Sequence, residues 1–352
     1  MTDNNEQTTQ TTQTTPKEHE PFTVDSFRPE DAKGIVELFR AVYGENYPIR
    51  LFYDPEAIAA ANREGRYYSI VARTNAGKVI GVTHLFRSAP CQSLYESGLG
   101  LVLKEFRNSG ATIRLMDFLF GEFVPRTPQI EEIFGEAVCN HPYMQKSVTR
   151  FHYIETAIEV ALMPAEAYTQ EKSAEGRVAT LNAFRCYKPK PHRIFLPAPY
   201  EQELRRIYAR LDDARDIVPS EAQIPDGVPS HAELDVFDFA RVARIAVHDI
   251  GTDFRDCIRD LESEAGIRKA VVFQVSLDLT QPWVGEAVAI LREKGYFFGG
   301  ALPRWFDNDG LLMQKLLCPP NFEGIVMVSD FANELLNVIK ADWQRAEAGH
   351  IV

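Results

Sequence analysis

A strand–turn–helix stretch in the first third of the chain constrains the fold more than any other feature. The apolar segment "GLGLVL" runs to Leu103, and Arg107 and the small polar residues 108–110 follow within a few positions. A helical pattern begins directly afterwards, and its apolar residues share one face: Ile113, Met116, Leu119 and Phe120. A strand that reaches a helix through so tight a turn is typical of layered α/β proteins.

The turn itself is suited to hold an anion. A helix N-terminus carries unpaired N–H groups and about half a positive charge. Gly110 lets a phosphate approach the backbone, and Arg107 adds a formal charge. An ordinary strand–turn–helix unit with a solvated arginine has the same residue pattern, so the turn alone leaves both interpretations open.

The patterns along residues 21–165 predict one folded unit. Apolar spacings follow in the order strand, two helices, three strands, helix, strand, helix and strand. The segment "TNAGK" separates two apolar runs as a hairpin turn, and Asp54 before Pro55 is typical of a helix start. We therefore expect an α/β (α+β) fold in which a mixed central sheet is flanked by helices.

A second unit is predicted over residues 201–345, after a stiff, proline-containing linker over 166–200. Its order reads helix, one or two strands, helix, strand, helix and strand. In both units a proline starts a helix after a strand, and a basic residue shortly precedes an aromatic one: Arg150 and Tyr153, then Lys294 and Tyr296. This likeness favours two tandem copies of one fold, although convergent strand–helix–strand units look the same.

Bulk composition excludes several classes of function. The formal net charge of −12 disfavours nucleic acid and anionic membranes as partners. No apolar run approaches the roughly 18 residues of a membrane span. The Thr/Gln-rich residues 1–20 predict a disordered tail and not a signal peptide. Cysteines without a C-x-x-C pair indicate free thiols in a reducing cytoplasm. Whether the chain forms a homo-oligomer stays open.

The stretch "VLKEFRNSGAT" resembles the phosphate-binding turn of the GNAT family of N-acetyltransferases, which follows the fourth strand of that fold. Arg107 and Gly110 match the family pattern, and Thr112 stands where the family usually has a smaller residue. The order of elements over residues 21–165 also looks like this family. The resemblance implies an acyl-CoA N-acyltransferase-like fold and acetyl-CoA as the co-substrate.

The resemblance also implies how acetyl-CoA is held. Backbone groups of the fourth strand would pair with the pantetheine arm, and amides of the turn would bind the pyrophosphate. The residues concerned are Leu101, Val102, Leu103, Arg107, Asn108, Ser109, Gly110, Ala111 and Thr112. Asn140, after the fifth strand, would hydrogen-bond the pantetheine, and the same residue also fits a helix N-cap.

Acyl transfer to an amine needs a base for the amine. Glu96 lies on the predicted fourth strand, where the family often places a general base; an exposed strand carboxylate is the alternative. Strict alternation puts Glu96 on one face with Gly98, Gly100 and Val102. A bulge in that strand would turn Glu96 away and favour Glu136 on the fifth strand.

The departing thiolate needs an acid. The family's usual tyrosine in the last helix has no equivalent here, because that position falls near Val148. Tyr143, about one turn earlier, or a water molecule is therefore expected to supply the proton. No metal is expected, since His84, His141 and His152 are scattered.

Together these inferences predict an acyl-CoA-dependent N-acyltransferase whose acceptor is the amine of a small molecule or an aminoacyl group. The alternative is a non-catalytic CoA-binding or regulatory protein, which the missing helix tyrosine supports. The second unit is expected to be degenerate, because the glycine of "HDIGTDFRD" is surrounded by carboxylates that would repel a pyrophosphate.

Overall fold

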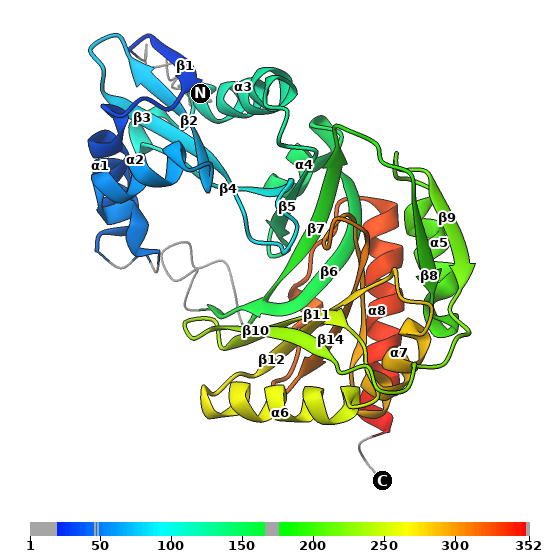
Figure 1. Cartoon of the computed structure of the whole chain (residues 1–352). Coiled ribbons are helices and arrows are strands. Elements are labelled where there is room, and N and C mark those ends of the chain that lie inside the picture. The colour runs from blue at the N-terminus through cyan, green and yellow to red at the C-terminus, as the bar shows by residue number, and fades with distance from the viewer. Residues whose placement is uncertain (1–19, 46, 48, 166–175, 350–352) are drawn as a thin grey trace, which may run out of the picture.

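The computed structural model describes residues 20–45, 47, 49–165 and 176–349 (Figure 1). The predicted tail over 1–20 lies outside them except for its last residue. The main elements of the first half are β1 (Phe22–Ser26), α1 (Asp31–Tyr43), α2 (Pro55–Arg63), β2 (Tyr67–Thr74), β3 (Val79–Phe86), β4 (Leu94–Val102), α3 (Ala111–Phe118), β5 (Glu132–Val138), α4 (Tyr143–Arg150), β6 (Ile154–Met163) and β7 (Val178–Cys186).

The second half contains further strands and helices. They are β8 (His192–Leu196), α5 (Glu201–Tyr208), β9 (Arg215–Pro219), β10 (His231–Phe237), β11 (Val242–Asp249), α6 (Phe254–Ile267), β12 (Val272–Asp278), α7 (Val284–Glu293), β13 (Phe297–Leu302), β14 (Gly310–Leu316) and α8 (Asp330–Ala348). The segment predicted as one or two strands forms two, β10 and β11. The elements β8, β9 and α8 have no counterpart in the predicted order, whereas β13 is the strand expected to open at the aromatic Tyr296.

Most of these strands join one sheet. It is 12-stranded, in the order β1-β2-β3-β4-β5-β7-β6-β13-β14-β12-β11-β10, and β8 pairs with β9 in a separate sheet. Parallel and antiparallel neighbours both occur in it, as in β11–β12 and β12–β14. Helices flank the sheet (Figure 1). The predicted mixed α/β fold is therefore confirmed.

Local signals place several elements where the sequence predicts them. Asp54 Oδ1 accepts hydrogen bonds from the backbone N–H groups of Glu56 (2.9 Å) and Ala57 (3.2 Å), and Pro55 occupies the first helical position of α2. This carboxylate replaces the partners that the first turn of a helix lacks. The apolar face of α1 is buried, at Ile35, Leu38 and Phe39.

The segment predicted as a linker over 166–200 contains sheet structure, and that prediction is wrong for residues 178–186 and 192–196. The first of these ranges is β7, which inserts between β5 and β6 and pairs antiparallel with both. The four prolines at 189, 191, 197 and 199 suggested a connector for the whole region. They follow β7 and do not interrupt it, so the first half extends beyond residue 165.

Two parallel strands of the first half, β4 and β5, separate from each other. They pair only at residues 94–96 with 132–134. Beyond this point, β4 also carries a bulge against β3. Leu101 lies opposite Val82 and Gly98 lies opposite His84, so β4 has one residue more than β3 between these pairs. Leu99 at the bulge has a φ of 54°.

The second half repeats part of the strand order of the first. The strands β12, β14 and β13 are arranged like β5, β7 and β6, and α7 corresponds to α4 between the first and last of each set. In contrast to β4 and β5, the parallel strands β11 and β12 stay paired from residues 242–247 to 272–277. They leave no opening between them. This arrangement is compatible with tandem duplication, which stays a prediction.

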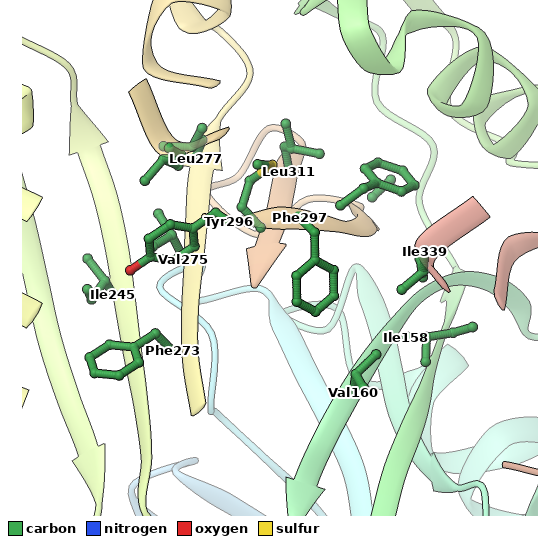
Figure 2. Close-up of a cluster of buried hydrophobic side chains, with 14 of the residues drawn as sticks. Ile158, Val160, Ile245, Phe273, Val275, Leu277, Tyr296, Phe297, Leu311 and Ile339 are labelled. Atoms are coloured by element: carbon green, nitrogen blue, oxygen red, sulfur yellow. The ribbon is translucent and has the colours of Figure 1, made fainter. Parts of the chain in front are cut away.

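The two halves share one sheet and one core at β6 and β13. Gly300 pairs with Ala157, and a side chain there would overlap the carbonyl oxygen of Thr156. The Gln314 side chain of β14 reaches β6, accepting from Val160 N (2.7 Å) and donating to the Ile158 carbonyl (2.8 Å). Figure 2 shows the buried cluster to which side chains of β6, β11, β12, β13, β14 and α8 contribute.

Candidate active site

A cavity of about 240 Å³ lies in the opening between β4 and β5. Residues of β3, α3, α4 and the segment leading into β6 complete its walls. Because β4 and β5 no longer pair beyond residues 96 and 134, the strand edges that face the opening leave backbone groups free for a ligand. The lining of this cavity includes Ser97, Gly98, Leu101, Val102, Thr112, Glu136 and Tyr153.

The turn between β4 and α3 presents unbonded amides. Three of its N–H groups are already engaged: Arg107 with the Lys104 carbonyl, Ser109 with the Phe106 carbonyl, and Ala111 with Ser109 Oγ. Within the described ranges, the N–H groups of Asn108, Gly110 and Thr112 have no intramolecular partner. Of the amides predicted for a pyrophosphate, these are the ones that can bind it.

Gly110 and Arg107 give this turn its shape and charge. Gly110 is the N-cap of α3 and has a φ of 80°, which is the left-handed region that glycine adopts without strain. A Cβ at this position would have no heavy atom within 4 Å, so the space beside the amides is open. The Arg107 side chain is exposed at the same turn.

Of the remaining residues predicted to hold acetyl-CoA, some line the cavity and others do not. Leu101 and Val102 line the cavity. Leu103 does not line it, and its amide is bonded to the Ile80 carbonyl at 2.9 Å. Asn140 lies in the bend between β5 and α4, and it is not among the lining residues.

A second cavity, of about 410 Å³, lies between the two halves of the chain. The first half contributes the β3–β4 connection at 87–90 together with Glu159 and Asn182. The second half contributes residues of β10, β11 and β12, among them Arg244 and Gln274. The first cavity is therefore built from the first half alone, whereas the second cavity requires both.

Strand register places the two predicted bases on one face of the sheet. Glu96 is the parallel partner of Phe134, and Glu136 follows Phe134 by two positions on β5. Asn182 on β7 lies opposite Glu136. Residues that lie opposite each other, or two apart in one strand, project from the same face. Glu96 and Glu136 therefore share a face with Asn182 of the second cavity.

The predicted alternation along β4 is corrected by the bulge. Glu96 and Gly98 share a face, because they lie opposite Phe86 and His84 of β3. The inserted residue reverses the alternation, so that Leu101 joins this face and Val102 does not. The bulge lies after Glu96 and does not turn the carboxylate away from Glu136.

An arginine from the second half pairs with Glu136 and with Glu159 of β6. Arg244 Nη2 of β11 donates to Glu136 Oε1 (3.0 Å) and to Glu159 Oε1 (3.2 Å), and its Nε donates to Gln274 Oε1 (2.9 Å). Glu136 lines the first cavity and Arg244 the second, so this ion pair joins the two. Sequence reasoning missed Arg244, which lies in a strand of ordinary apolar and polar alternation with no motif around it.

Burial shifts the pKa of both candidate bases upward. The pKa of Glu96 is raised to about 7, chiefly by burial, with a further rise from the carboxylate of Glu159. The hydrogen bond from Ser88 Oγ (2.6 Å) and the charge of Arg244 oppose that rise. Burial and Glu159 also raise the pKa of Glu136 well above its ordinary value. A carboxyl that changes protonation near neutral pH, as Glu96 does, is suited to general base catalysis.

The structure does not bring Tyr143 to either cavity. Its side chain is 73% exposed at the start of α4. Tyr153, which the sequence singled out only as the aromatic residue before a strand, lines the first cavity. Its hydroxyl is 2.8 Å from Ser97 Oγ, and burial raises its pKa above the ordinary value. Tyr153 therefore stays protonated and can donate a hydrogen bond inside the cavity.

Groups that can bind a metal occur elsewhere among the described residues. One set is Glu132, Cys186 and Asp213, and the other is His192, Asp213 and Asp309. Arg215 donates to Asp309 at 2.5 Å and lies 3.6 Å from Asp213. None of these five acidic, thiol or imidazole groups lines either cavity described above. We assign them to a buried ionic network.

Comparisons with known proteins give structural matches only: no family model and no curated protein matches the sequence. The ribosomal-protein-S18-alanine N-acetyltransferase of Escherichia coli matches at 14% identity and a TM-score of 0.37, over 48% of this chain and 96% of that one. The ribosomal-protein-S5-alanine acetyltransferase of Vibrio fischeri matches at 12% identity and 0.38, over 48% and 94%. The spermidine/spermine N-acetyltransferase of Vibrio cholerae matches at 14% and 0.34, over 47% and 92%.

The described helices also bear on membrane insertion. In the part of the chain that the structure describes, no helix combines the length and the apolarity that crossing a membrane requires.

Proposed function

We propose that this protein is an acyl-CoA-dependent N-acyltransferase that transfers an acetyl group to an amine. The observation that carries the proposal is the opening between β4 and β5. It is bordered by a turn with free amides at the start of α3, and Glu136 lines it. Glu96, whose pKa is about 7, is held on the same sheet face.

The residues around the opening fit acetyl-CoA. The amides of Asn108, Gly110 and Thr112, with the Arg107 guanidinium beside them, suit a pyrophosphate. The unpaired edge of β4 at Leu101 suits the amide groups of a pantetheine arm. Acetyl-CoA supplies the activated acyl group as a thioester.

Glu96 serves as the general base in this proposal. Near neutral pH about half of its carboxyl groups are ionised, and Ser88 orients the carboxylate through one oxygen. Glu136 is the alternative base, although its pairing with Arg244 limits its freedom to accept a proton. Tyr153, hydrogen-bonded to Ser97, is the donor available to the departing thiolate.

A second candidate function is CoA binding without catalysis. The exposed position of Tyr143 favours it, because the proton donor expected on α4 does not reach the cavity. This candidate shares the cavity and the turn with the first and differs only in turnover.

Calorimetry with the full chain and acetyl-CoA, followed by detection of released thiol with a panel of amines, separates the candidates. We expect one acetyl-CoA per chain, because β11 and β12 stay paired and offer no second opening. We also expect thiol release with at least one amine. Binding without release from any amine would favour the non-catalytic protein, and the absence of binding would contradict both candidates.

A further inference from the structure

Two buried amide groups in the second cavity lack hydrogen-bond acceptors. Asn182 is 2% exposed and Gln274 is 3% exposed, and both line the cavity. Among the described residues, neither Asn182 Nδ2 nor Gln274 Nε2 has a partner. Buried N–H donors are almost always paired in native proteins, so these two indicate a ligand oxygen that completes them.

Three acidic and two basic side chains line this cavity, and the basic ones are Arg87 and Arg244. The guanidinium of Arg87 lies over the Tyr95 ring. The buried carboxylate of Glu159 lines it, and Glu233 and Asp235 of β10 are exposed along the same wall. The positive charge of Arg244 is shared between Glu136 and Glu159. An ammonium group is therefore attracted to the cavity, whereas a free carboxylate meets like charges.

The position of the cavity connects it to the candidate bases. Ser88 lines it and donates to Glu96 at 2.6 Å. Arg244 lines it and donates to Glu136 at 3.0 Å. A ligand in this cavity thus lies next to groups that hold both carboxyls in place.

We propose that the second cavity is the acceptor site, and that it binds a primary amine that also carries an uncharged carbonyl oxygen, as an amino-acid amide does. The inference rests on the proposed function and names the class of its acceptor. Asn182 and Gln274 donate to the carbonyl oxygen, and the amine lies toward Glu96. Because one amide comes from β7 and the other from β12, both halves of the chain determine which acceptor binds.

In the acetyl transfer that follows, every bond and proton is accounted for. The amine nitrogen forms a bond to the thioester carbon, and the carbon–sulfur bond breaks. The bound ammonium loses two protons in all, one to become the free amine that attacks and one as the nitrogen is acylated. Glu96 takes the first and releases it to solvent, then takes the second, and Tyr153 supplies a proton to the departing thiolate. Solvent restores both residues, and the products are the N-acetylated amide and CoA.

The test is binding of three probes to the full chain, measured by ligand-observed NMR. Alaninamide carries the amine and an uncharged carbonyl, alanine carries a carboxylate, and propylamine has no oxygen. We expect alaninamide to bind more tightly than the other two. Equal or tighter binding of propylamine or alanine would overturn the inference.

Variants then locate the contact. Asn182→Leu and Gln274→Met each remove one donor at similar side-chain size, and each should weaken alaninamide binding by about three- to tenfold. Propylamine binding should not change. The matched control is Gln223→Met, at an exposed loop position outside the cavity. Circular dichroism verifies that each variant folds. Because the two residues lie on different strands, one variant still tests the contact if the other does not fold.

Acetyl-CoA affinity, measured on the same samples, tests the proposed function separately from the acceptor assignment. It should be the same in the wild type and both variants, because neither residue lines the first cavity. Unchanged alaninamide binding in both variants would overturn the acceptor assignment even if acetyl-CoA binds. Loss of acetyl-CoA binding in the wild type would instead contradict the proposed function.

Discussion

At the scale of single residues, Glu96 combines position with a raised pKa. It lies at the last residue pair that joins β4 to β5, where the opening begins. The residue as a whole is half-buried, and burial raises the pKa of its carboxyl to about 7. A base with these properties can reach a substrate and still change its protonation near neutral pH.

The first prediction concerns Glu96→Gln. We expect kcat to fall by about a hundred- to ten-thousandfold, the usual contribution of a general base, with acetyl-CoA affinity unchanged. Wild-type activity should rise with pH through about 7, because only the ionised carboxylate accepts a proton, and the variant should lack this rise. Steady-state kinetics across pH measures both effects. The control is Glu37→Gln on the exposed side of α1, and wild-type turnover in Glu96→Gln would exclude the assignment.

The second prediction concerns Arg244, which acts on the carboxyls as a positioning residue. Its positive charge lowers the pKa of Glu96 and Glu136, so its removal raises both. In Arg244→Met the rise of activity should therefore move to higher pH. Arg244→Lys keeps a charge and should shift the profile less. An identical pH profile in wild type and Arg244→Met would show that this residue does not set the protonation of the base.

At the scale of elements, the turn before α3 depends on backbone shape and not on side chains. Gly110 holds a left-handed conformation beside open space. The amides of Asn108, Gly110 and Thr112 have no intramolecular partner in the described part of the turn. The backbone of this turn is therefore suited to bind an anion.

The third prediction compares Gly110→Asp with Gly110→Asn, which introduce side chains of nearly the same size. Both residues tolerate a left-handed conformation, and only Asp adds a negative charge next to the phosphate. We expect acetyl-CoA affinity to fall by about tenfold or more in Gly110→Asp and much less in Gly110→Asn, by calorimetry at low ionic strength. If both variants bind like the wild type, the pyrophosphate does not lie at this turn.

At the scale of the whole molecule, the junction between the halves consists of few backbone pairs. The strand β13 meets β6 at Gly300 and Ala157, and Gln314 supplies two further hydrogen bonds. The helix α8 packs on both strands and closes the core over this junction. Each half by itself would expose part of the shared core.

The fourth prediction tests that junction with Gln314→Leu. The change leaves Val160 N–H and the Ile158 carbonyl buried without partners, each at a cost of about 1–3 kcal/mol. We expect the free energy of unfolding to fall by about 2–6 kcal/mol, measured by urea denaturation. Gln223→Leu in an exposed loop should have little effect. A change of the same size in both variants would mean that Gln314 does not hold the halves together.

The insertion of β7 shows why the whole sheet could not be predicted. Its residues are buried between β5 and β6, where both faces of a strand are covered and alternation is weak. The prolines that follow at 189–199 provided a stronger local signal for a linker. Strand pairing depends on segments far away in the chain, and no local pattern records it.

Elements with local causes can be predicted from neighbouring residues. The capped start of α2, the turn at Gly110 and the placement of Glu96 on a strand follow from residues only a few positions apart. The tertiary structure alone decided the separation of β4 from β5, the bulge at Leu99 and the contact of Arg244 with Glu136. The physical reason is that register and charge pairing arise between distant segments, and only packing brings these segments together.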